Sequence, residues 1–385
     1  MRLQNKLLAN FKLETYIPPK WLKESINEKF FPKKRINFNL NETQIEKLDN
    51  LNLVFKENNL KKFSIYLQRD DLNHNNNLVS GNKIRKLEFL FADAILNNCK
   101  HVITAGGIQS NHCRAVAVLA SLLKLNCHLF LRSSTSNPHE LYNNGNLLID
   151  RIYGANVYLI EKKSQYLNDI KYKMELLQEK LLNYSKRESY IIPIGGSNTI
   201  GLFGYFEAFD KILKHQNSID DIILTAGSGG TMSSIAIANL LTGSKFKIHA
   251  LNVCDNAKYF YDHLDTQLKE LHLDQFKANE LVNIIDGYKG SGYGLSTNAE
   301  LDLIIKIARE TGVLFDPVYT GKAFIGFIKT IINNCENFKG NRMLFIHTGG
   351  IFSHFDGRFS ETFKKNSMES PVYDCFYENI KNINF

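Results

Sequence analysis

The feature that most constrains the fold is an alternation of short apolar runs with longer amphipathic stretches, which continues from about residue 88 onward. Near-continuous apolar runs of this length favour strands that are buried on both faces of a parallel sheet. Helical periods lie between the runs, as in residues 164–184. The runs are HVITA from His101, CHLFLR from Cys127, NVYLI from Asn156, YIIPI from Tyr190, DIILTA from Asp221, KIHALNV from Lys247 and MLFIH from Met343.

This alternation predicts an α/β protein with parallel strands joined by helices. A chain of 385 residues with 44% hydrophobic content can bury cores for two domains. We therefore expect two open, mostly parallel twisted sheets in two domains. The smaller domain is predicted over residues 87–200, and the larger over residues 36–86 and 201–385. Residues 1–35 contain three of the seven prolines and are expected to form an irregular N-terminal arm with short helical turns.

Most of the formal charge of +8 lies in that arm, which contains nine Lys or Arg residues and three Glu, so 9 − 3 = +6. A nucleic-acid binder that used this arm would bind in a salt-sensitive way; we predict no nucleic-acid partner. No apolar run reaches the roughly 20 residues of a membrane span, so no membrane association is expected. We predict a cytoplasmic location, with a mitochondrial presequence as the alternative because Arg2, Lys6 and Lys12 alternate with apolar residues. The six scattered cysteines predict reduced thiols and no metal site.

Glycine-rich loops follow three of the predicted strands, at the edge where an open parallel sheet binds its ligands. The loop Ala226 to Thr231 (AGSGGT) leaves a strand and precedes a helix that begins near Met232, so free backbone amides and a helix N-terminus can bind one phosphate. It lacks the Gly-Lys-Ser/Thr of a P-loop and the third glycine of a dinucleotide fold. A simple tight turn is the alternative interpretation.

Two further segments carry reactive groups. Lys83 precedes an amphipathic helix, and a buried lysine at such a place would become a nucleophilic amine. Alone it is weak support, because surface lysines are common. The loop Gly106 to His112 offers amides and polar side chains that suit a substrate carboxylate, although Ser110 or Asn111 could serve only as a helix N-cap.

Together these segments resemble a known family. The ordered motifs GNKIRKLEFLFADA, ITAGGIQSNH, IPIGGSNTIGLFGY, AGSGGT, GYG, DPVYTGKA and HTGG run from about Arg69 to Gly350. They resemble the D-cysteine desulfhydrase and 1-aminocyclopropane-1-carboxylate deaminase family, within the tryptophan synthase β-like, fold-type-II group of pyridoxal-phosphate enzymes. One departure is Ser80, which stands where the bacterial pattern has glycine.

The resemblance implies pyridoxal phosphate as cofactor, a small amino acid as substrate and a homodimer. The implied catalytic residues are Lys83, as the Schiff-base lysine, with Ser110, Tyr293 and Tyr319. The implied cofactor-binding residues are Lys83, Asn82, Asn111, Gly227, Ser228, Gly229, Gly230, Thr231, Tyr319 and Thr348. The implied substrate-binding residues are Ser110, Asn111, His112 and Tyr293.

Two threonines distinguish the members of this family. Thr320 and Thr348 stand where the deaminases typically have glutamate and leucine, which resembles the desulfhydrases. A hydroxyl facing the pyridine nitrogen leaves the ring a weaker electron sink than a carboxylate does, and that suits β-elimination. The prediction is a lyase of D-amino acid catabolism that converts D-cysteine to pyruvate, ammonia and hydrogen sulfide, with Lys83 or Ser110 as the base. The alternatives are a 1-aminocyclopropane-1-carboxylate deaminase that gives 2-oxobutyrate, and a non-catalytic protein that binds pyridoxal phosphate.

Overall fold

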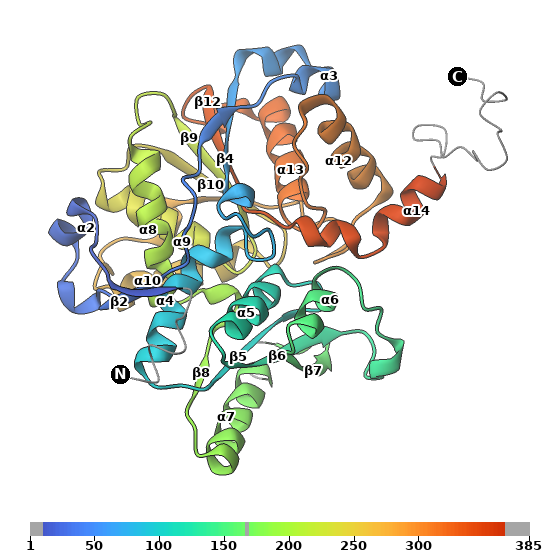
Figure 1. Cartoon of the computed structure of the whole chain (residues 1–385). Helices are drawn as coiled ribbons and strands as arrows, with labels where there is room; N and C mark the ends of the chain where they lie inside the picture. Colours follow the sequence, from blue (N-terminus) through green and yellow to red (C-terminus); the bar gives the residue numbers. More distant parts are fainter. Residues whose placement is uncertain (1–10, 166–168, 366–385) are drawn as a thin grey trace.

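The computed structural model describes residues 11–165 and 169–365 and has two main parallel sheets, one above the other in Figure 1. The larger sheet has six strands and is parallel except for β3, which runs antiparallel to β4. Its order is β11 (Asn283–Ile285), β10 (Lys247–Asn252), β9 (Asp221–Ala226), β12 (Arg342–His347), β4 (Ser64–Arg69) and β3 (Ile45–Lys47).

The smaller sheet has four strands, all parallel. Its order is β7 (Asn156–Glu161), β6 (Asn126–Ser133), β5 (His101–Gly107) and β8 (Ser189–Ile191). The predicted α/β class with parallel sheets is confirmed, and each of the seven predicted strands is present. The predicted domain limits remain a prediction.

Both sheets are covered by helices on both faces, which explains the near-continuous apolar runs. Along β12, Leu344 and Ile346 pack into one core, which also contains residues of α8 (Thr199–Leu213), α9 (Gly230–Leu241) and α10 (Ala257–Glu270). Met343 and Phe345 pack into a second core, with residues of α12 (Asn298–Thr311) and α13 (Thr320–Asn333). Alternate residues of a strand point to opposite faces, so a strand between two helical layers needs apolar side chains at every position.

The helix assignments follow the predicted amphipathic stretches. The helix predicted over residues 164–184 is α7, Lys171–Ser185, and part of the predicted range lies outside the described residues. The α-helices are α2 (Lys20–Ser25), α3 (Leu51–Phe55), α4 (Asn82–Leu96), α5 (Asn111–Leu122), α6 (Gly145–Ile152), α7, α8 (Thr199–Leu213), α9 (Gly230–Leu241), α10 (Ala257–Glu270), α11 (Ala278–Leu281), α12 (Asn298–Thr311), α13 (Thr320–Asn333) and α14 (Arg358–Lys365). Two of the 3-10 turns are η6 (Ile194–Gly196) and η8 (Ile351–Phe355).

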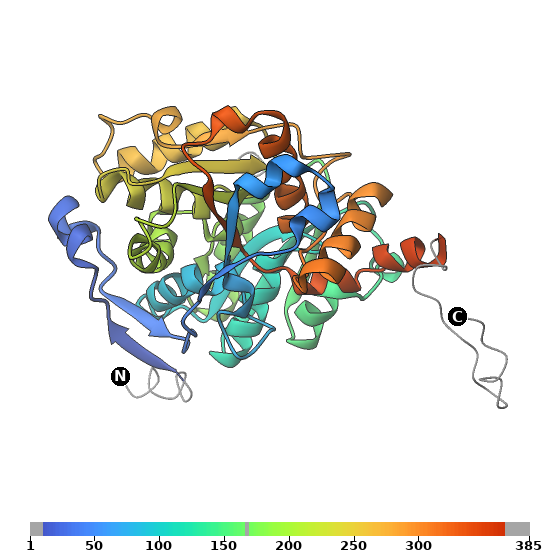
Figure 2. The same ribbon diagram turned by 90° about the horizontal axis from the view of Figure 1, so that it is seen from above.

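The N-terminal segment is more regular than predicted. Strand β1 (Lys12–Thr15) pairs antiparallel with β2 (Lys34–Asn37), and the pair is visible at the lower left of Figure 2. Tyr16, Leu22 and Ile26 are buried in the core that also contains α8 and α9. The expected short helical turns are present as α2 and a 3-10 turn at Glu28–Phe30, but the segment is not irregular, because β1 and β2 pair and apolar side chains anchor it to the fold.

Helix α4 lies between the two sheets in Figure 1. It contacts α8 of the larger unit and α5 of the smaller one, and most of its side chains are buried. Lys83 stands in the first turn of this helix rather than before it. The start of α4 is thus held from both sides. Among the helices of the described ranges, none is long and apolar enough to cross a membrane.

Candidate active site

A pocket lies where the carboxyl ends of strands from both sheets meet. Gly106 and Gly107 at the end of β5 line it from the smaller sheet, and the loop after β9 lines it from the larger sheet. Every predicted site residue lines the pocket except Gly230, which begins α9 directly behind it. The predicted residues that line it are Asn82, Lys83, Ser110, Asn111, His112, Gly227, Ser228, Gly229, Thr231, Tyr293, Tyr319 and Thr348.

The Lys83 amine lies in this pocket and is shielded from water. Burial lowers the pKa of Lys83 to about 8, against a small opposing effect of the Cys113 thiol. At pH 7 a pKa of about 8 leaves roughly one amine in ten neutral, compared with fewer than about one in a thousand for an ordinary lysine. The pocket therefore supplies a nucleophile and a proton acceptor near neutral pH.

The loop that enters α9 forms an anion cradle. The first-turn amides of a helix have no acceptor one turn earlier, and here Gly230 N donates to Ser197 Oγ at 3.2 Å. Ser197 Oγ also lies 2.7 Å from Ser228 Oγ, and Asn82 Nδ2 donates to Thr231 Oγ1 at 3.1 Å. A Cβ at Gly227 would lie 3.1 Å from the Tyr319 ring, so a larger residue there would have to displace that ring. Amides, hydroxyls and a helix N-terminus together suit a phosphate.

Asn111 presents a hydrogen-bond donor to the pocket. Its Oδ1 accepts a hydrogen bond from Asn146 Nδ2 at 3.1 Å, and Asn146 is itself fully buried and held by Arg114 and Gln109. This network fixes the amide orientation, so that Asn111 Nδ2 remains free to donate. A ring oxygen is the kind of acceptor that such an amide can bind.

Ser110 is the N-cap of α5, and its Oγ accepts the Cys113 amide at 3.2 Å. The N-cap interpretation from the sequence therefore applies to this side chain. The following amides, those of Asn111 and His112, begin the helix and lie at the pocket, where they suit a carboxylate. Helix geometry thus assigns the anion to backbone groups, with the Ser110 hydroxyl beside them.

The His112 side chain is a neutral acceptor. Burial lowers the pKa of His112 well below its ordinary value, and Lys83 and Lys86 add repulsion. Thr104 donates its hydroxyl hydrogen to Ile192 O at 2.7 Å, so His112 Nε2 has to donate to Thr104 Oγ1 at 3.0 Å. The buried Nδ1 then carries a lone pair, with no partner in the described part of the chain. This tautomer fits a donor group of a ligand better than a carboxylate oxygen.

Tyr293 and Tyr319 form a pair of neutral phenols. Their hydroxyl groups hydrogen-bond to each other, and the ring centroids are 5.8 Å apart. Burial is the main cause that raises the pKa of each tyrosine. Tyr293 also packs on Gly107, where an added Cβ would lie 3.0 Å from its ring. The pair therefore links the smaller sheet to the start of α13 across the pocket.

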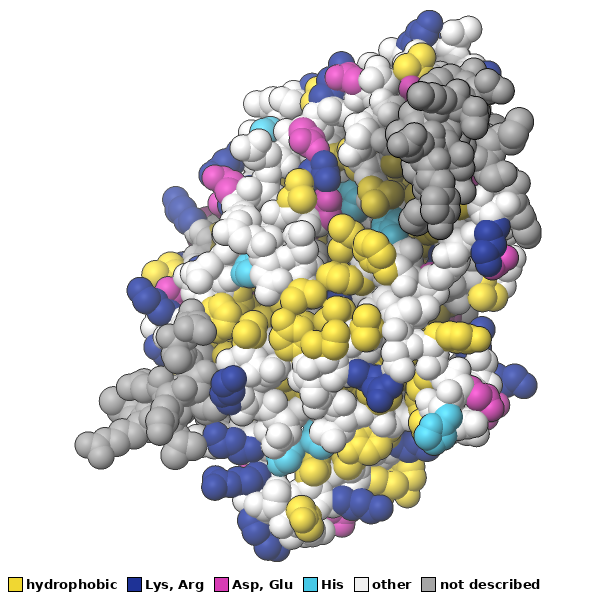
Figure 3. Space-filling view, turned by 45° about the vertical axis from the view of Figure 1, so that its right-hand side comes forward, with side chains coloured by type: hydrophobic (Ala, Val, Ile, Leu, Met, Phe, Trp, Pro, Cys, Tyr) yellow, Lys and Arg dark blue, Asp and Glu magenta, His cyan; other side chains and the backbone are white. Residues whose placement is uncertain are grey.

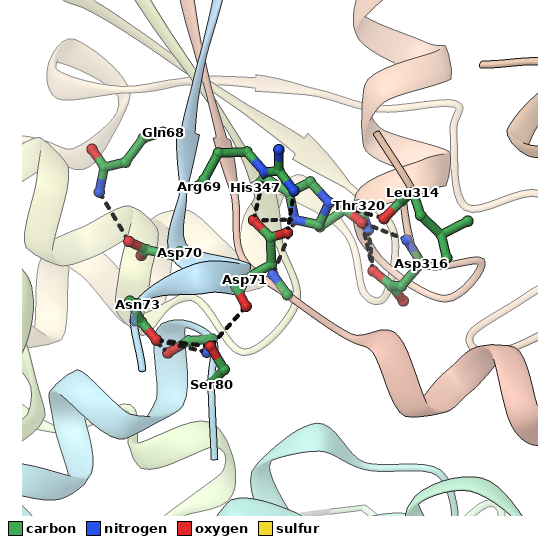
Figure 4. A network of polar contacts seen from close by, with 12 residues as sticks. Gln68, Arg69, Asp70, Asp71, Asn73, Ser80, Leu314, Asp316, Thr320 and His347 are labelled. Atoms are coloured by element: carbon green, nitrogen blue, oxygen red, sulfur yellow. Dashed lines mark hydrogen bonds and ion pairs between the residues drawn. The ribbon is translucent and has the colours of Figure 1, made fainter. Parts of the chain in front are cut away.

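A polar network fixes the turn before Lys83, and Figure 4 shows Asn73 and Ser80 of this network beside Asp71. Buried Asn73 accepts the Gly81 amide and donates to the Gly81 carbonyl, both at 3.0 Å. Ser80 Oγ donates to the carbonyl of Asp71 at 2.7 Å, so this serine keeps a structural function in place of glycine. Gly81 has φ +121°, and a Cβ there would lie 2.9 Å from Thr348 O. The residues preceding Lys83 are thus held against the Thr348 turn.

The two diagnostic threonines have different surroundings. Thr348 lines the pocket. Thr320 is fully buried outside the lining, where its hydroxyl donates to Asp316 Oδ1 at 2.7 Å. Of the described residues that line the pocket, none is Asp or Glu. Of these two threonines, therefore, Thr348 is the one that can present its hydroxyl to a bound group.

Several residues at or near the pocket were not predicted from the sequence. Arg132 and Cys254 line the pocket. Ser197 supports the cradle, and Lys86 is buried with its Nζ 3.3 Å from Gly195 O and 2.7 Å from the place of a Gly230 Cβ. Position at a strand end could have indicated Arg132, and the motif IPIGGSNTIGLFGY contains Ser197. Lys86 lacked any signal that separated it from other lysines. The described residues contain no group of three His, Cys, Asp or Glu placed to hold a metal ion.

Comparisons with known proteins agree with this geometry. Residues 36–349 match the family described as pyridoxal-phosphate dependent enzymes. A protein of Arabidopsis thaliana named as a bifunctional D-cysteine desulfhydrase/1-aminocyclopropane-1-carboxylate deaminase, mitochondrial, is 42% identical over 302 residues, which are 76% of this chain and 73% of that protein. A solved structure of an ACC deaminase homologue aligns with a TM-score of 0.73 and 28% identity over 94% of this chain and 99% of that one. An O-ureido-L-serine synthase structure, with 13% identity and a TM-score of 0.57 over 86% of this chain and 94% of that one, shares the fold.

Proposed function

This chain belongs to the family of pyridoxal-phosphate-dependent enzymes, and on that premise we propose that it is a D-cysteine desulfhydrase, with Lys83 as the lysine that binds the cofactor. The observation that carries the proposal is the meeting, in one pocket, of the Lys83 amine, the anion cradle of α9 and the α5 amide site. The Arabidopsis relative named for this activity supports it.

The residues present fit pyridoxal phosphate. The cradle of Ser228, Thr231 and the first-turn amides of α9 would hold its phosphate, and Asn111 Nδ2 would donate to its ring oxygen. Thr348 would lie at the ring nitrogen. When bound, the cofactor supplies the electron sink for the pair of electrons released when a bond to the substrate Cα breaks.

The protein's own groups would divide the remaining work. The α5 amides of Asn111 and His112 would orient the substrate carboxylate, and Lys83 Nζ would take the Cα proton. We favour Lys83 over Ser110 as the base, because its pKa lies near 8 and the hydroxyl of Ser110 is engaged as an N-cap. Tyr293 and Tyr319 would exclude water from the reacting end.

The lack of an acidic residue among the described lining residues favours elimination over ring opening. A hydroxyl at Thr348 leaves the ring nitrogen unprotonated, and a weaker electron sink suffices where the leaving group departs readily. Deamination of 1-aminocyclopropane-1-carboxylate to 2-oxobutyrate is the second candidate, because the Arabidopsis relative is named for both activities. A non-catalytic protein would have no use for the orienting amides.

The test is a product assay on wild type, Lys83→Ala and Lys173→Ala, in which Lys173 is an exposed lysine of α7. Each is supplied with D-cysteine, L-cysteine and 1-aminocyclopropane-1-carboxylate while the cofactor's visible absorbance is recorded. We expect sulfide and pyruvate from D-cysteine alone, lost with the absorbance only in Lys83→Ala. Absorbance without any product in wild type would refute the desulfhydrase assignment and leave the cofactor assignment intact.

We also propose that the chain forms a homodimer. Helix α6 and η8 pack together and expose large apolar side chains, and Figure 3 shows hydrophobic side chains gathered across the middle of this side of the molecule. The exposed residues are Leu148, Ile152, Ile351 and Phe355. Sedimentation should give a dimer for wild type and for the exposed control Tyr184→Asp, and a monomer for Ile152→Asp/Phe355→Asp. A monomeric wild type would refute it.

For the compartment we propose the cytoplasm. The basic stretch that suggested a presequence continues into paired strand β1, and Phe11 and Leu13 pack on the core. A fusion to a fluorescent protein, imaged in cells, tests this proposal, and mitochondrial fluorescence would contradict it.

A further inference from the structure

Arg132 is a cation at the pocket that has no role in the cofactor and carboxylate sites described so far. It stands near the carboxyl end of β6 and lines the pocket. Its Nε donates to Ser164 O at 3.1 Å, and the terminal nitrogens have no carboxylate or other hydrogen-bond partner within residues 11–165 and 169–365. An arginine has five donors, so most of its hydrogen-bonding capacity is available to a ligand.

The strand register fixes the direction in which Arg132 points. Arg132 is the registered partner of Gly107 on β5, and registered neighbours project from the same face of a sheet. A Cβ on Gly107 would point at the Tyr293 ring, 3.0 Å away, and its hydroxyl, 3.4 Å away. Arg132 therefore projects toward the Tyr293 end of the pocket, on the face opposite to α5.

The surroundings leave the Arg132 charge uncompensated. Cys254 is close enough for the guanidinium to lower the pKa of its thiol slightly, but burial is the larger effect and raises that pKa to about 11. The Cys254 thiol is therefore neutral near pH 7. Tyr293 is also a neutral phenol, because burial raises its pKa. The Asp255 carboxylate also raises the pKa of the Cys254 thiol, whereas Lys289, like Arg132, lowers it. Within the described residues, however, Arg132 forms no ion pair, and no Asp or Glu lines the pocket.

We propose that Arg132 stabilises the negative charge that develops on the substituent leaving from the substrate Cβ, and so gives the site its preference for leaving groups as basic as a thiolate. This inference rests on the proposed function. In the elimination the Cα proton goes to Lys83, the Cα–H electron pair forms the Cα=Cβ bond, and the Cβ–S pair departs on sulfur. Hydrolysis of the product balances D-cysteine and water against pyruvate, ammonia and hydrogen sulfide. A preorganised charge at the departing atom acts in the transition state.

The kinetic test compares two substrates that share a carboxylate and differ in the leaving group. Chloride from β-chloro-D-alanine is a far weaker base than thiolate and needs little stabilisation. Arg132→Gln should therefore lower kcat/KM for D-cysteine by about 100-fold and for β-chloro-D-alanine by less than about threefold. Arg132→Lys should restore part of the loss. The matched control Arg151→Gln, on the exposed face of α6, should leave kcat/KM for both substrates unchanged. The cofactor absorbance of every variant should equal that of wild type.

Equal losses on both substrates would overturn the proposal, because Arg132 would then bind the shared carboxylate or support the fold. An unchanged kcat/KM for both substrates would overturn it as well.

If wild type acts on neither substrate, the proposed function fails, but a binding measurement can still test the role of Arg132. D-aspartate and D-asparagine have the same shape and differ in the charge at the β-substituent. Titrations followed by cofactor absorbance should show tighter binding of D-aspartate to wild type and no preference in Arg132→Gln; a preference that survives in the variant refutes the inference.

Discussion

Lys83 and Lys86 stand three residues apart at the start of α4, so their side chains share one side of the helix. Burial lowers the pKa of both, and repulsion from Lys83 adds to the effect at Lys86. Their surroundings differ: Lys83 opens into the pocket, and Lys86 is buried below the anion cradle. The same residue type thus serves as a reactive amine at one position and as a buried, proton-poor amine at the other.

The lowered pKa of Lys83 predicts how cofactor uptake depends on pH. Addition to an aldehyde requires the neutral amine, so uptake by cofactor-free protein should rise about tenfold per pH unit below a midpoint near 8 and level off above it. Rapid-mixing absorbance between pH 6 and 10 measures this rate. A midpoint near the ordinary lysine value would show that the amine is solvated.

Lys86→Met should weaken cofactor binding. A phosphate in the cradle would lie beside the Lys86 amine and favour its charged form, and a hydrogen bond to a charged group contributes about 1.5–3 kcal/mol. Titration with pyridoxal phosphate should therefore show a Kd raised by about 10- to 100-fold, with Lys173→Met as an unaffected control. Equal affinities of Lys86→Met and wild type would place the phosphate elsewhere.

The family resemblance predicted the residues that lie within its sequence motifs. Lys83, Asn111 and Gly227 belong to this class, since each acts from the start of a helix or from a loop that is recognisable in the sequence. For Arg132 the sequence offered only its position near a strand end, and for Lys86 it offered no signal, because the residues that give them significance, Tyr293 and Gly230, lie more than a hundred residues away.

At the scale of elements, α4 connects the two sheets, and a buried ion pair holds it. Arg85 of α4 donates to Asp70 at 2.7 Å, Tyr205 of α8 hydrogen-bonds to the same carboxylate, and Gln68 of β4 donates to it at 3.2 Å. Asp70 is fully buried and Arg85 nearly so. The Asp70 carboxylate therefore joins α4, α8 and β4 at one point, close to the turn that precedes Lys83.

Asp70→Ala should lower the free energy of unfolding by about 3–5 kcal/mol, because it leaves the Arg85 charge buried without its partner. Asp49→Ala, which removes an exposed ion pair with Lys47, should cost less than about 1 kcal/mol. Urea unfolding followed by circular dichroism compares the two. Similar losses for both variants would mean that water reaches the Arg85 guanidinium.

The sequence did not predict β1, β2, β3, β4 and β11, which are all short or interrupted by polar residues. Strands β3 and β11 have three residues each, and neither continues into a long apolar run as the equally short β8 does in YIIPI. Strand β4 reads SIYLQR, and its buried Gln68 donates to Asp70. Such segments contain too few consecutive apolar residues to be recognised as strands by their apolar pattern.

At the scale of the whole molecule, the N-terminal segment belongs to the packed structure rather than to a separate arm. Leu22 is fully buried against α8 and α9, whereas Ile17 nearby is 74% exposed. The lysines of residues 12–35 point outward around this apolar anchor. The excess charge therefore follows from the surface position of the segment and does not require a polyanionic partner.

Leu22→Ala should destabilise the protein by about 2–5 kcal/mol, the usual cost of removing a buried leucine side chain. Ile17→Ala should change stability by less than about 0.5 kcal/mol. Thermal and urea unfolding of the full chain measure both. A neutral Leu22→Ala would show that the segment detaches in solution.

The two buried amines beside the anion cradle have a consequence for how long the cofactor-free protein persists in a cell. Without cofactor, Lys83 disfavours the charged form of Lys86, and His112 Nδ1 has no partner in the part of the chain that the structure describes. A ligand that binds only the folded state raises its stability in proportion to the logarithm of its concentration. Newly made chains would therefore be cleared faster when cofactor is scarce, so that quality control would match the amount of enzyme to the supply of its cofactor.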